Sequence, residues 1–437
     1  MNKVQIFRVA KVPNTKSPYR VKWRVAGHDK TRAFKKQALA EKFNRELHAA
    51  LERGDHFSSV TGEPDSLIQS KTTFASCAAA YVADNYNQWE PSSRRSTIQA
   101  LTHSVLVLNR SKSFPYEREI MADVVRKFLL KPSQNAVPDS EKSEALKWLL
   151  NNSIPLQDLS PDILHACLTT TSKTLDGKNN VAASTLRKRK QALHATLKFG
   201  VSKKYIHKNP LDNVNFRVTL DDEAINPKSV LSPKECREIQ EIIAKRGERG
   251  LITSIFIACI WLAGLRPSEV AALRPMDIHF NDSGINEIVV SRAIVEVGKS
   301  WTNDGSMSVT KQPKARRRGH SRSVPIPTEL VQVLKPYIAG MAPESLIFPG
   351  PRSKDKQKPI SLSAIEEAWA NARTTTHTLY DLRHTNATIL IYSELNVAEV
   401  AMRLGHSVAV CSRVYLGVFN SQQVRSNAKV DAFLASA

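Results

Sequence analysis

The sequence predicts a multi-domain, mainly α-helical protein that also contains small antiparallel sheets. Its 437 residues are enough for two to four domains that each bury a core. Most of the chain places apolar residues at helical spacing, and β-type runs are confined to its start and to two places after residue 284. Polar, Pro-containing segments at 55–72 and 219–228 separate a small α+β N-terminal domain, an all-α middle domain and a mostly α C-terminal domain with a small antiparallel sheet.

The composition is that of a folded, strongly basic protein. Lys and Arg total 63 against 41 Asp and Glu, a net charge of +22, and hydrophobic residues make up 41% of the chain. This composition excludes a disordered basic tail and favours a polyanionic partner. The five cysteines are scattered, without a C-x-x-C pair, which argues against a disulfide framework and structural zinc and favours a reducing cytoplasm. We expect no metal and no cofactor.

No segment reads as a signal peptide or a membrane span. The N-terminus lacks an apolar core, and the strongest apolar run, residues 251–265, is interrupted by Thr253 and Ser254. We expect this run to be one buried helix and the protein to have no membrane partner.

The N-terminal domain, residues 1–62, carries 14 Lys and Arg against 5 Asp and Glu. Its β-type runs at 4–10, 19–25 and 31–34, followed by helical spacing over 38–53, predict a three-stranded sheet with one helix. In the second run, basic residues alternate with aromatic ones, which suits a strand laid in a nucleic-acid groove. The candidate DNA contacts are Arg20, Lys22 and Arg24; the alternative is a solvated strand face with Trp23 in a small core.

The middle domain, residues 73–215, has an all-helical pattern. We predict helices over 74–89, 93–108, 118–130, 140–150, 161–170 and 184–201, with Ser160-Pro161-Asp162 as a helix start. The last helix is rich in basic residues, which form either a DNA-facing stripe or a solvated helix face. These residues are Arg187, Lys188, Arg189, Lys190 and Lys198, of which Arg187, Lys188 and Lys190 are the main DNA-binding candidates.

The C-terminal domain, residues 225–437, holds four segments that form one chemical set. A capping box at Ser232 opens it, and an apolar helix ends at Gly264. The segments are AGLRPSEVAAL (263–273), TKQPKARRRGHSRSVPIP (310–327), YDLRHTNAT (380–388) and LGHSVAVCSRVYLGVF (404–419). They supply two arginines, a lysine in a basic hairpin-like loop, a histidine after a helix-ending Gly, and a tyrosine nine residues later.

These residue types suit phosphodiester chemistry without a metal. Paired guanidiniums stabilise the charge on a transferring phosphate, and a tyrosine beside them can act as a nucleophile. A phosphotyrosyl intermediate stores the energy of the broken bond, so religation needs no ATP. A lysine near the leaving oxygen can supply the proton that this oxygen requires.

The four segments resemble the catalytic signature of the tyrosine recombinase, or phage integrase, family, and the resemblance covers nearly the whole chain. It implies an arm-type DNA-binding domain over 1–62, a helical core-binding (SAM-like) domain over 73–215 and a catalytic domain over 225–437. The match is nearest to a bacterial mobile-element integrase, which implies a cytoplasmic, nucleoid-associated protein. By this resemblance, Arg266 and Arg383 are the catalytic arginines, His406 is the late histidine and Tyr415 is the nucleophile.

Two positions stay open within this resemblance. The catalytic lysine is Lys314 or Lys311, and the spacing to Val324 favours Lys314 without excluding Lys311. The family usually has histidine where this chain has Tyr380; a phenol hydrogen-bonds a phosphate but is a poor base, so part of that role falls to His384 or His406. The basic residues Arg316, Arg317, Arg318 and Arg322 of the same loop either track the DNA backbone or form a solvated loop, and Lys311 is a further DNA-binding candidate.

The implied activity is site-specific strand exchange through a 3′-phosphotyrosyl link and a Holliday junction, which integrates or excises a mobile element. The implied partners are double-stranded DNA at core and arm sites, three further copies of the chain in a homotetramer, a host DNA-bending protein and a directionality factor. The C-terminal stretch 420–434 has helical spacing and docks either on a neighbouring protomer or on its own domain. The alternatives are a type IB topoisomerase and a catalytically inactive DNA-binding regulator.

Overall fold

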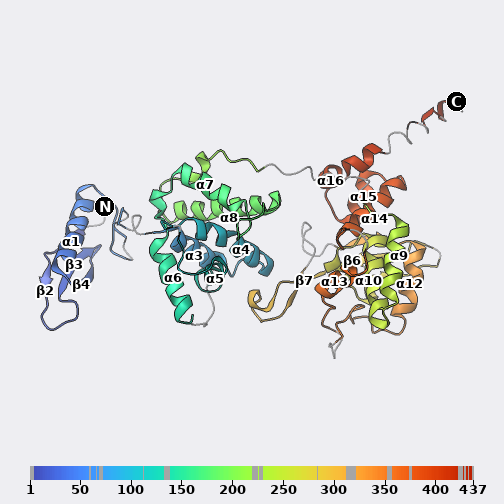
Figure 1. Ribbon diagram of the computed structural model, residues 1–437, viewed down its shortest axis with the longest axis horizontal. Helices are drawn as coiled ribbons and strands as arrows, with labels where there is room; N and C mark the ends of the chain where they lie inside the picture. The colour runs from blue at the N-terminus through green and yellow to red at the C-terminus, as the bar shows by residue number, and fades with distance from the viewer. Residues whose placement is uncertain are drawn as a thin grey trace. The chain divides into compact units, whose positions relative to one another are not determined.

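The computed structural model confirms the mainly α fold with small antiparallel sheets. It describes residues 4–58, 61–64, 66–67, 72–111, 113–131, 138–218, 225, 230–282, 284–311, 321–351, 357–373, 376–421, 427, 430–431 and 433–435. The chain divides into two compact units, Met1–Leu220 and Asp221–Ala437 (Figure 1).

The first unit begins with an antiparallel sheet centred on β3. The elements are β1 (Val4–Ile6), β2 (Ala10–Lys11), β3 (Tyr19–Val25), β4 (His28–Phe34) and helix α1 (Gln37–Glu52). Both β1 and β2 pair with β3, β1 at Trp23–Val25 and β2 at Tyr19–Arg20, whereas β4 pairs with all of β3. The strand predicted over 4–10 is therefore two short strands in the same sheet.

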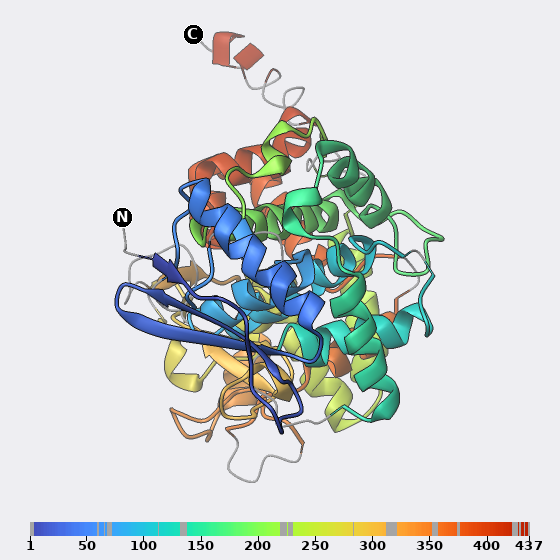
Figure 2. The same ribbon diagram turned by 90° about the vertical axis from the view of Figure 1, so that its left-hand side faces the viewer.

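The period of two in β3 sends its apolar and basic side chains to opposite faces. Val21, Trp23 and Val25 are buried, and α1 covers that face with Phe43 and Leu47. The intervening Arg20, Lys22 and Arg24 are exposed on the open face. The sheet and α1 are seen from a second side in Figure 2.

The segment after α1 corrects the predicted linker at 55–72. Phe57 and Leu67 are buried in the same core as α1, and the indole of Trp23 donates to the Gly62 carbonyl at 2.5 Å. Isolated apolar residues among Gly, Pro and Ser have no periodicity, so the sequence pattern hides their packing. The N-terminal core therefore extends to Leu67, beyond the predicted start of the linker.

The middle helices pack around one another within the first unit. They are α3 (Phe74–Asn85), α4 (Pro91–Val107), α5 (Arg118–Val124), α6 (Ser140–Asn152), α7 (Pro161–Thr171) and α8 (Ala183–Ser202). A π-helical turn, Val125–Leu129, follows α5 inside the predicted helix 118–130. The predicted start at Ser160 is confirmed, because its side chain caps α7 at Ile163.

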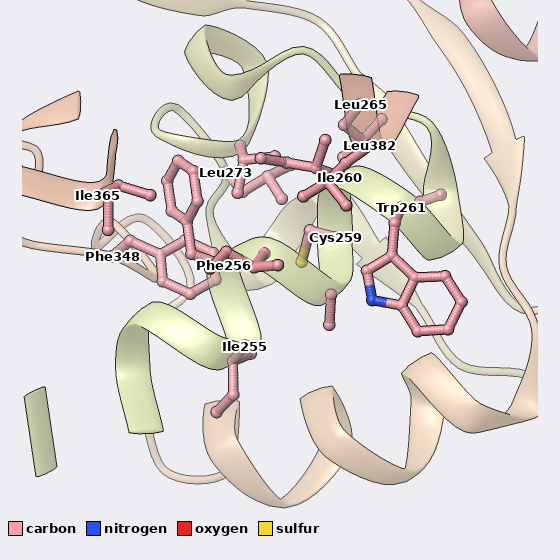
Figure 3. Close-up of a cluster of buried hydrophobic side chains, with 14 of the residues drawn as sticks. Ile255, Phe256, Cys259, Ile260, Trp261, Leu265, Leu273, Phe348, Ile365 and Leu382 are labelled. Atoms are coloured by element: carbon pink, nitrogen blue, oxygen red, sulfur yellow. The ribbon is translucent and has the colours of Figure 1, made fainter. Parts of the chain in front are cut away.

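The second unit is built around the apolar helix α10 (Glu248–Ala263), the buried helix predicted from residues 251–265. Phe256, Cys259 and Ile260 lie among Phe348 and Leu382 in its core (Figure 3). Helices α9 (Pro233–Ala244) and α12 (Thr328–Ile338) pack against α10, and α13 (Leu362–Ala370) packs against α9 and contributes to the same core. Among the described residues, no helix is long and apolar enough to cross a membrane.

Two small sheets and four further α-helices make up the rest of the described part of this unit. One sheet has the order β5 (Ile278–His279), β6 (Glu287–Val290), β9 (Arg322–Pro325), and the hairpin of β7 (Ala293–Glu296) and β8 (Ser308–Lys311) forms the other. The short helix α11 (Pro267–Val270) follows α10. Helices α14 (Asp381–Tyr392), α15 (Val397–Leu404) and α16 (Val408–Ser421) pack against one another and bring the last two motifs together.

Candidate active site

Arg383 is the centre of the candidate site. It lies in the first turn of α14, is fully buried, and donates through its guanidinium to the carbonyls of Gly264 and Leu404. Its Nη2 also lies 3.0 Å from Nε2 of His406. One side chain therefore connects the ends of α10 and α15 with the histidine that follows α15.

Two glycines make this close approach possible. Gly264 ends α10 and Gly405 ends α15, both in the left-handed region at φ +65°, which favours glycine. A Cβ at Gly264 would lie 2.4 Å from Oδ1 of Asn386, and one at Gly405 would lie 3.2 Å from Nη1 of Arg322. The sequences AGLR and LGH thus place an arginine and a histidine just after tightly packed turns.

Arg266 precedes α11 and is held by Glu269. Its backbone N–H donates to Oε2 of Glu269 at 2.9 Å, its Nη1 donates to Oε1 at 2.9 Å, and its Nη2 donates to the Gly405 carbonyl at 3.4 Å. The Arg266 side chain keeps 33% of its surface exposed. Arg266 is therefore oriented within the cluster and still accessible to a ligand.

Glu269 also pairs with a second arginine, Arg322 on β9. Nη1 and Nη2 of Arg322 donate to the two carboxylate oxygens at 2.8 and 2.6 Å, and its Nε donates to the Arg403 carbonyl at 3.1 Å. Burial alone would raise the pKa of Glu269, but the hydrogen bonds and charge of Arg322, together with Arg266, lower it to about 2. The carboxylate is ionised at neutral pH.

Tyr415 lies on α16 and is fully buried. Its hydroxyl is 3.0 Å from Nδ1 of His384, the residue after Arg383 on α14. Tyr380, at the N-terminus of α14, has 44% of its surface exposed and contacts the His384 ring edge-on, with ring centroids 5.4 Å apart. His384 therefore lies between an exposed and a buried tyrosine.

Burial sets the ionisation states of these groups. It lowers the pKa of His406 to about 4, with the charges of Arg383 and Arg266 adding to the effect, so the imidazole is neutral at pH 7. Burial also raises the pKa of Tyr415 well above its usual range, although Arg383 opposes the shift. Arg383, with a pKa lowered to about 10 mainly by burial, remains a cation.

Two buried nitrogens in this cluster have no hydrogen-bond partner among the described residues: Nε of Arg383 and Nδ1 of His406. An unpartnered buried polar atom costs free energy, and such atoms in native proteins call for an explanation. Together with Arg266, they give the cluster hydrogen-bonding capacity for an anionic ligand.

The structure thus brings five of the six predicted catalytic positions into one cluster: Arg266, Tyr380, Arg383, His406 and Tyr415. The sixth, Lys314, and the basic residues Arg316, Arg317 and Arg318 lie outside the described residues. Lys311 ends β8 and pairs in register with Ala293 of β7. Which of the two lysines serves the site stays a prediction.

The candidate DNA contacts of the N-terminal sheet differ in their partners. Lys22 and Arg24 both form ion pairs with Asp29 on β4, at 2.7 and 2.6 Å. These ion pairs hold the pKa of Asp29 well below its usual range, chiefly through the Arg24 hydrogen bond. Arg20 is exposed on the same face of the sheet.

The basic residues of α8 point in different directions. Arg187 and Lys188 are exposed, whereas Arg189 is buried and donates to the carbonyls of Thr171 and Lys173. Arg189 therefore does not belong to the predicted exposed stripe. Lys190 is half-buried and its ammonium donates to the Phe216 carbonyl at 2.7 Å.

A cavity of about 310 Å³ opens beside this face of α8, between α4, α5 and α8. Its lining includes three cations, Arg126, Lys188 and Arg189, and His103 on α4. Burial, together with the charge of Arg189, lowers the pKa of His103 to about 4. The cavity is therefore positively charged at neutral pH through the arginines and the lysine.

Sequence reasoning missed Glu269 and left His384 as one of two alternatives. Its assignment of Arg322 to the DNA backbone or a solvated loop was wrong, because Arg322 is buried and its guanidinium pairs with Glu269. Glu269 and Arg322 are 53 positions apart, and no local pattern reveals their pairing. Glu269 lies within the GLRPSE motif, and Arg322 precedes VPIP, so both fell inside the quoted segments. The sequence did contain one indication: each is a charged residue at a position where the periodicity of the helix or strand predicts a buried side chain.

Comparison with known proteins gives a family match for most of the second unit. Residues 229–421 match the model of the phage integrase family. A tyrosine recombinase of Pseudothermotoga lettingae is 24% identical over 291 residues, which cover 64% of this chain and 85% of that protein. A tyrosine recombinase of Thermosipho africanus is 27% identical over 194 residues, covering 43% of this chain and 57% of that protein.

Among solved structures, a lambda integrase dimer bound to a COC′ core site is 13% identical, with a TM-score of 0.46 and coverage of 93% of both chains. The family match covers the part of the chain that holds the cluster, and the relatives carry the name tyrosine recombinase. Over residues 229–421 the chain thus matches the phage integrase family, and the curated relatives to which it is similar are tyrosine recombinases.

Proposed function

We propose that this chain is an integrase that cleaves and rejoins DNA strands through a 3′-phosphotyrosyl intermediate and a Holliday junction, and so integrates or excises a mobile element. The observation that carries the proposal is the cluster of Arg266, Arg383, His406 and Tyr415 around the ends of α10 and α15. It combines a nucleophile with two permanent cations.

The two arginines supply the main stabilisation. As the phosphorus gains its fifth oxygen, negative charge builds up on the non-bridging oxygens, and positioned guanidiniums stabilise it. Removal of one such donor typically costs roughly 10²–10³ in rate. Arg266 is partly exposed and is therefore the arginine that binds an incoming phosphate first. Arg383 is buried and donates hydrogen bonds to backbone carbonyls such as that of Gly264.

His406 and Tyr380 bind the phosphate in this mechanism. Nδ1 of His406 is buried and without a partner among the described residues, so it is available to a phosphate oxygen. The exposed phenol of Tyr380 takes the position of the family's usual histidine as a hydrogen-bond donor. Lys314, with Lys311 as the alternative, protonates the leaving 5′ oxygen.

The DNA-free site is closed, because Arg383 and Tyr415 are both fully buried. A phosphate therefore reaches the Tyr415 hydroxyl only after the groups that cover this site move, and the proposal keeps Tyr415 in contact with His384.

We extend the proposal to the rest of the chain. Residues 1–62 bind arm sites through Arg20, Lys22 and Arg24; residues 73–215 bind core sites through Arg187, Lys188 and Lys190; and residues 225–437 catalyse, with Lys311, Arg316, Arg317 and Arg318 on the DNA backbone. The separate core of the N-terminal sheet and the charged cavity beside α8 support this division.

The proposed assembly is a homotetramer on two duplexes, helped by a host DNA-bending protein and a directionality factor in a bacterial cytoplasm. Support for contact between protomers comes from the C-terminal stretch, where Val430, Phe433 and Leu434 are exposed. Apolar side chains at helical spacing on the surface favour burial against another chain.

The test is a covalent-adduct assay. Supercoiled DNA that carries the sequences flanking the gene is incubated with wild type and with Tyr415→Phe, and the products are run on a denaturing gel. A protease-sensitive protein–DNA adduct in wild type only, together with recombinant products, is the expected result. An adduct without recombinants would indicate a topoisomerase, and tight binding without an adduct would indicate a non-catalytic regulator.

A further inference from the structure

The hydroxyl of Tyr415 has one hydrogen-bonding neighbour in the described structure, the imidazole of His384. Nδ1 lies 3.0 Å from the hydroxyl oxygen, and the two ring centroids are 5.8 Å apart at an interplanar angle of 60°. This distance is within the range for direct proton transfer. The two residues are 31 positions apart and come from different helices, α14 and α16.

The other histidine of the cluster is engaged elsewhere. Nε2 of His406 lies 3.0 Å from Nη2 of Arg383, a permanent cation at neutral pH. A proton on that nitrogen would face the guanidinium. His406 therefore suits phosphate binding, and His384 is the imidazole next to the reacting oxygen.

The surroundings of His384 keep it neutral before DNA arrives. Burial lowers its pKa, Asp381 acts in the opposite direction, and Arg383 adds to the lowering. The other titratable groups around it are Tyr380 at the start of α14, His406 after α15 and Tyr415 on α16. A neutral imidazole with the proton on Nε2 leaves the Nδ1 lone pair for the tyrosine hydroxyl.

We propose that His384 is a catalytic residue, the base that takes the proton from Tyr415. The Tyr415 oxygen forms a bond to phosphorus as the bond from phosphorus to the 5′ oxygen breaks. The hydroxyl proton passes to Nδ1 of His384, and the leaving 5′ oxygen takes a proton from the lysine of segment 310–327. In religation, the imidazolium returns its proton to the departing tyrosine oxygen. The inference rests on the proposed cleavage reaction.

The incoming phosphodiester makes this transfer favourable. Its negative charge arrives next to a buried imidazole, and a nearby opposite charge favours the protonated form of histidine. Asp381, which follows Tyr380, favours the same form. The bound phosphate thus raises the pKa of His384, so that the imidazole is a stronger base when Tyr415 attacks.

Single-turnover cleavage of duplexes cut from the DNA that flanks the gene tests the role. His384→Asn keeps an acceptor oxygen near the position of Nδ1 but cannot hold a proton at neutral pH, and His384→Ala removes both functions. His279→Asn, at an exposed histidine of β5, is the matched control. Circular dichroism and DNA affinity are measured for each variant.

We expect both His384 variants to bind DNA as wild type does and to cleave roughly 10²–10⁴-fold more slowly, the usual contribution of a general base. His279→Asn should cleave within about threefold of wild type. If His384 only positions the tyrosine by a hydrogen bond, His384→Asn will retain activity and only His384→Ala will lose it, which would overturn the proposal.

A duplex with sulfur in place of the bridging 5′ oxygen separates the two proton transfers, because a thiolate leaves without an acid. This substrate should rescue Lys314→Ala or Lys311→Ala and leave His384→Asn slow. Rescue of His384→Asn would place the histidine on the leaving-group side and contradict the inference. If wild type forms the adduct and His384→Asn cleaves normally, the inference alone is overturned. If wild type forms no adduct, the proposed function is overturned together with the inference.

Discussion

Glu269 and Arg322 form a buried bidentate ion pair next to Arg266, the arginine to which we assign the phosphate, and their side chains are only 2% and 4% exposed. The same carboxylate accepts the backbone and side-chain hydrogen bonds of Arg266. A buried ion pair is a costly way to gain stability, so its value here is geometric. It fixes the first residue that a phosphate meets.

Glu269→Gln should reduce the free energy of unfolding by about 3 kcal/mol, because it leaves Arg322 buried without its counter-charge. The pKa of Glu269 is lowered to about 2 in the folded chain, so its stabilisation is present above about pH 4.5 and lost as the pH falls toward 2. The free energy of unfolding, measured with denaturant, should therefore fall more steeply for wild type than for Glu269→Gln across this pH range. Glu238→Gln, at an exposed site on α9, is the control; equal acid sensitivity of wild type and Glu269→Gln would contradict the assignment.

Arg266→Lys should slow strand cleavage by roughly 10²-fold or more while DNA affinity changes by less than about threefold. Lysine keeps the charge but lacks the planar fork that bonds two oxygens at once. The measurement is single-turnover cleavage beside equilibrium binding. If Arg266→Lys cleaved DNA at nearly the wild-type rate, positive charge alone would be sufficient at this position.

Asp29→Asn should tighten the binding of arm-site DNA, because it releases Lys22 and Arg24 from their shared carboxylate. We expect an affinity gain of a few-fold and a steeper dependence on salt, since two more cations become available to phosphates. Arg20→Ala should act in the opposite direction. Fluorescence anisotropy across a salt series measures both, and unchanged binding by Asp29→Asn would mean that this face does not meet DNA.

Lys188→Ala should weaken binding to core-site DNA and reduce the salt slope by about 1, the effect of one lost phosphate contact. Its ammonium lines the charged cavity beside α8. Lys147→Ala, at an exposed lysine of α6 in the same unit, should leave the slope unchanged. The same slope for both variants would remove the cavity from the DNA interface.

Most of the helices could be predicted from the sequence, because each helix buries one face and its apolar residues therefore recur at helical spacing. The expectation for 161–170 matches Pro161–Thr171, and Ser232 caps α9 as its motif indicates. The π-helical turn at Val125–Leu129 was not foreseen, because apolar spacing does not encode the hydrogen-bond register. The hairpin of β7 and β8 was missed because β8, with the sequence SVTK, has Val309 as its single apolar residue and so shows no alternation.

Only those residues of the candidate site that lie in a recognisable sequence motif could be predicted. Arg266, Arg383, His406 and Tyr415 lie in recognisable segments, and the fold brings them together. The contact of His384 with Tyr415 depends on how α14 packs against α16, and a linear pattern contains no such information.

The most direct test of the central claim is to identify the residue and the DNA end in the covalent adduct. DNA labelled on either side of the cleaved phosphate is trapped, digested with protease and nuclease, and analysed by mass spectrometry. The account predicts a phosphorylated Tyr415 peptide joined to the 3′ end, with a free 5′ hydroxyl on the other strand segment. Attachment at another residue, or to the 5′ end, would contradict it.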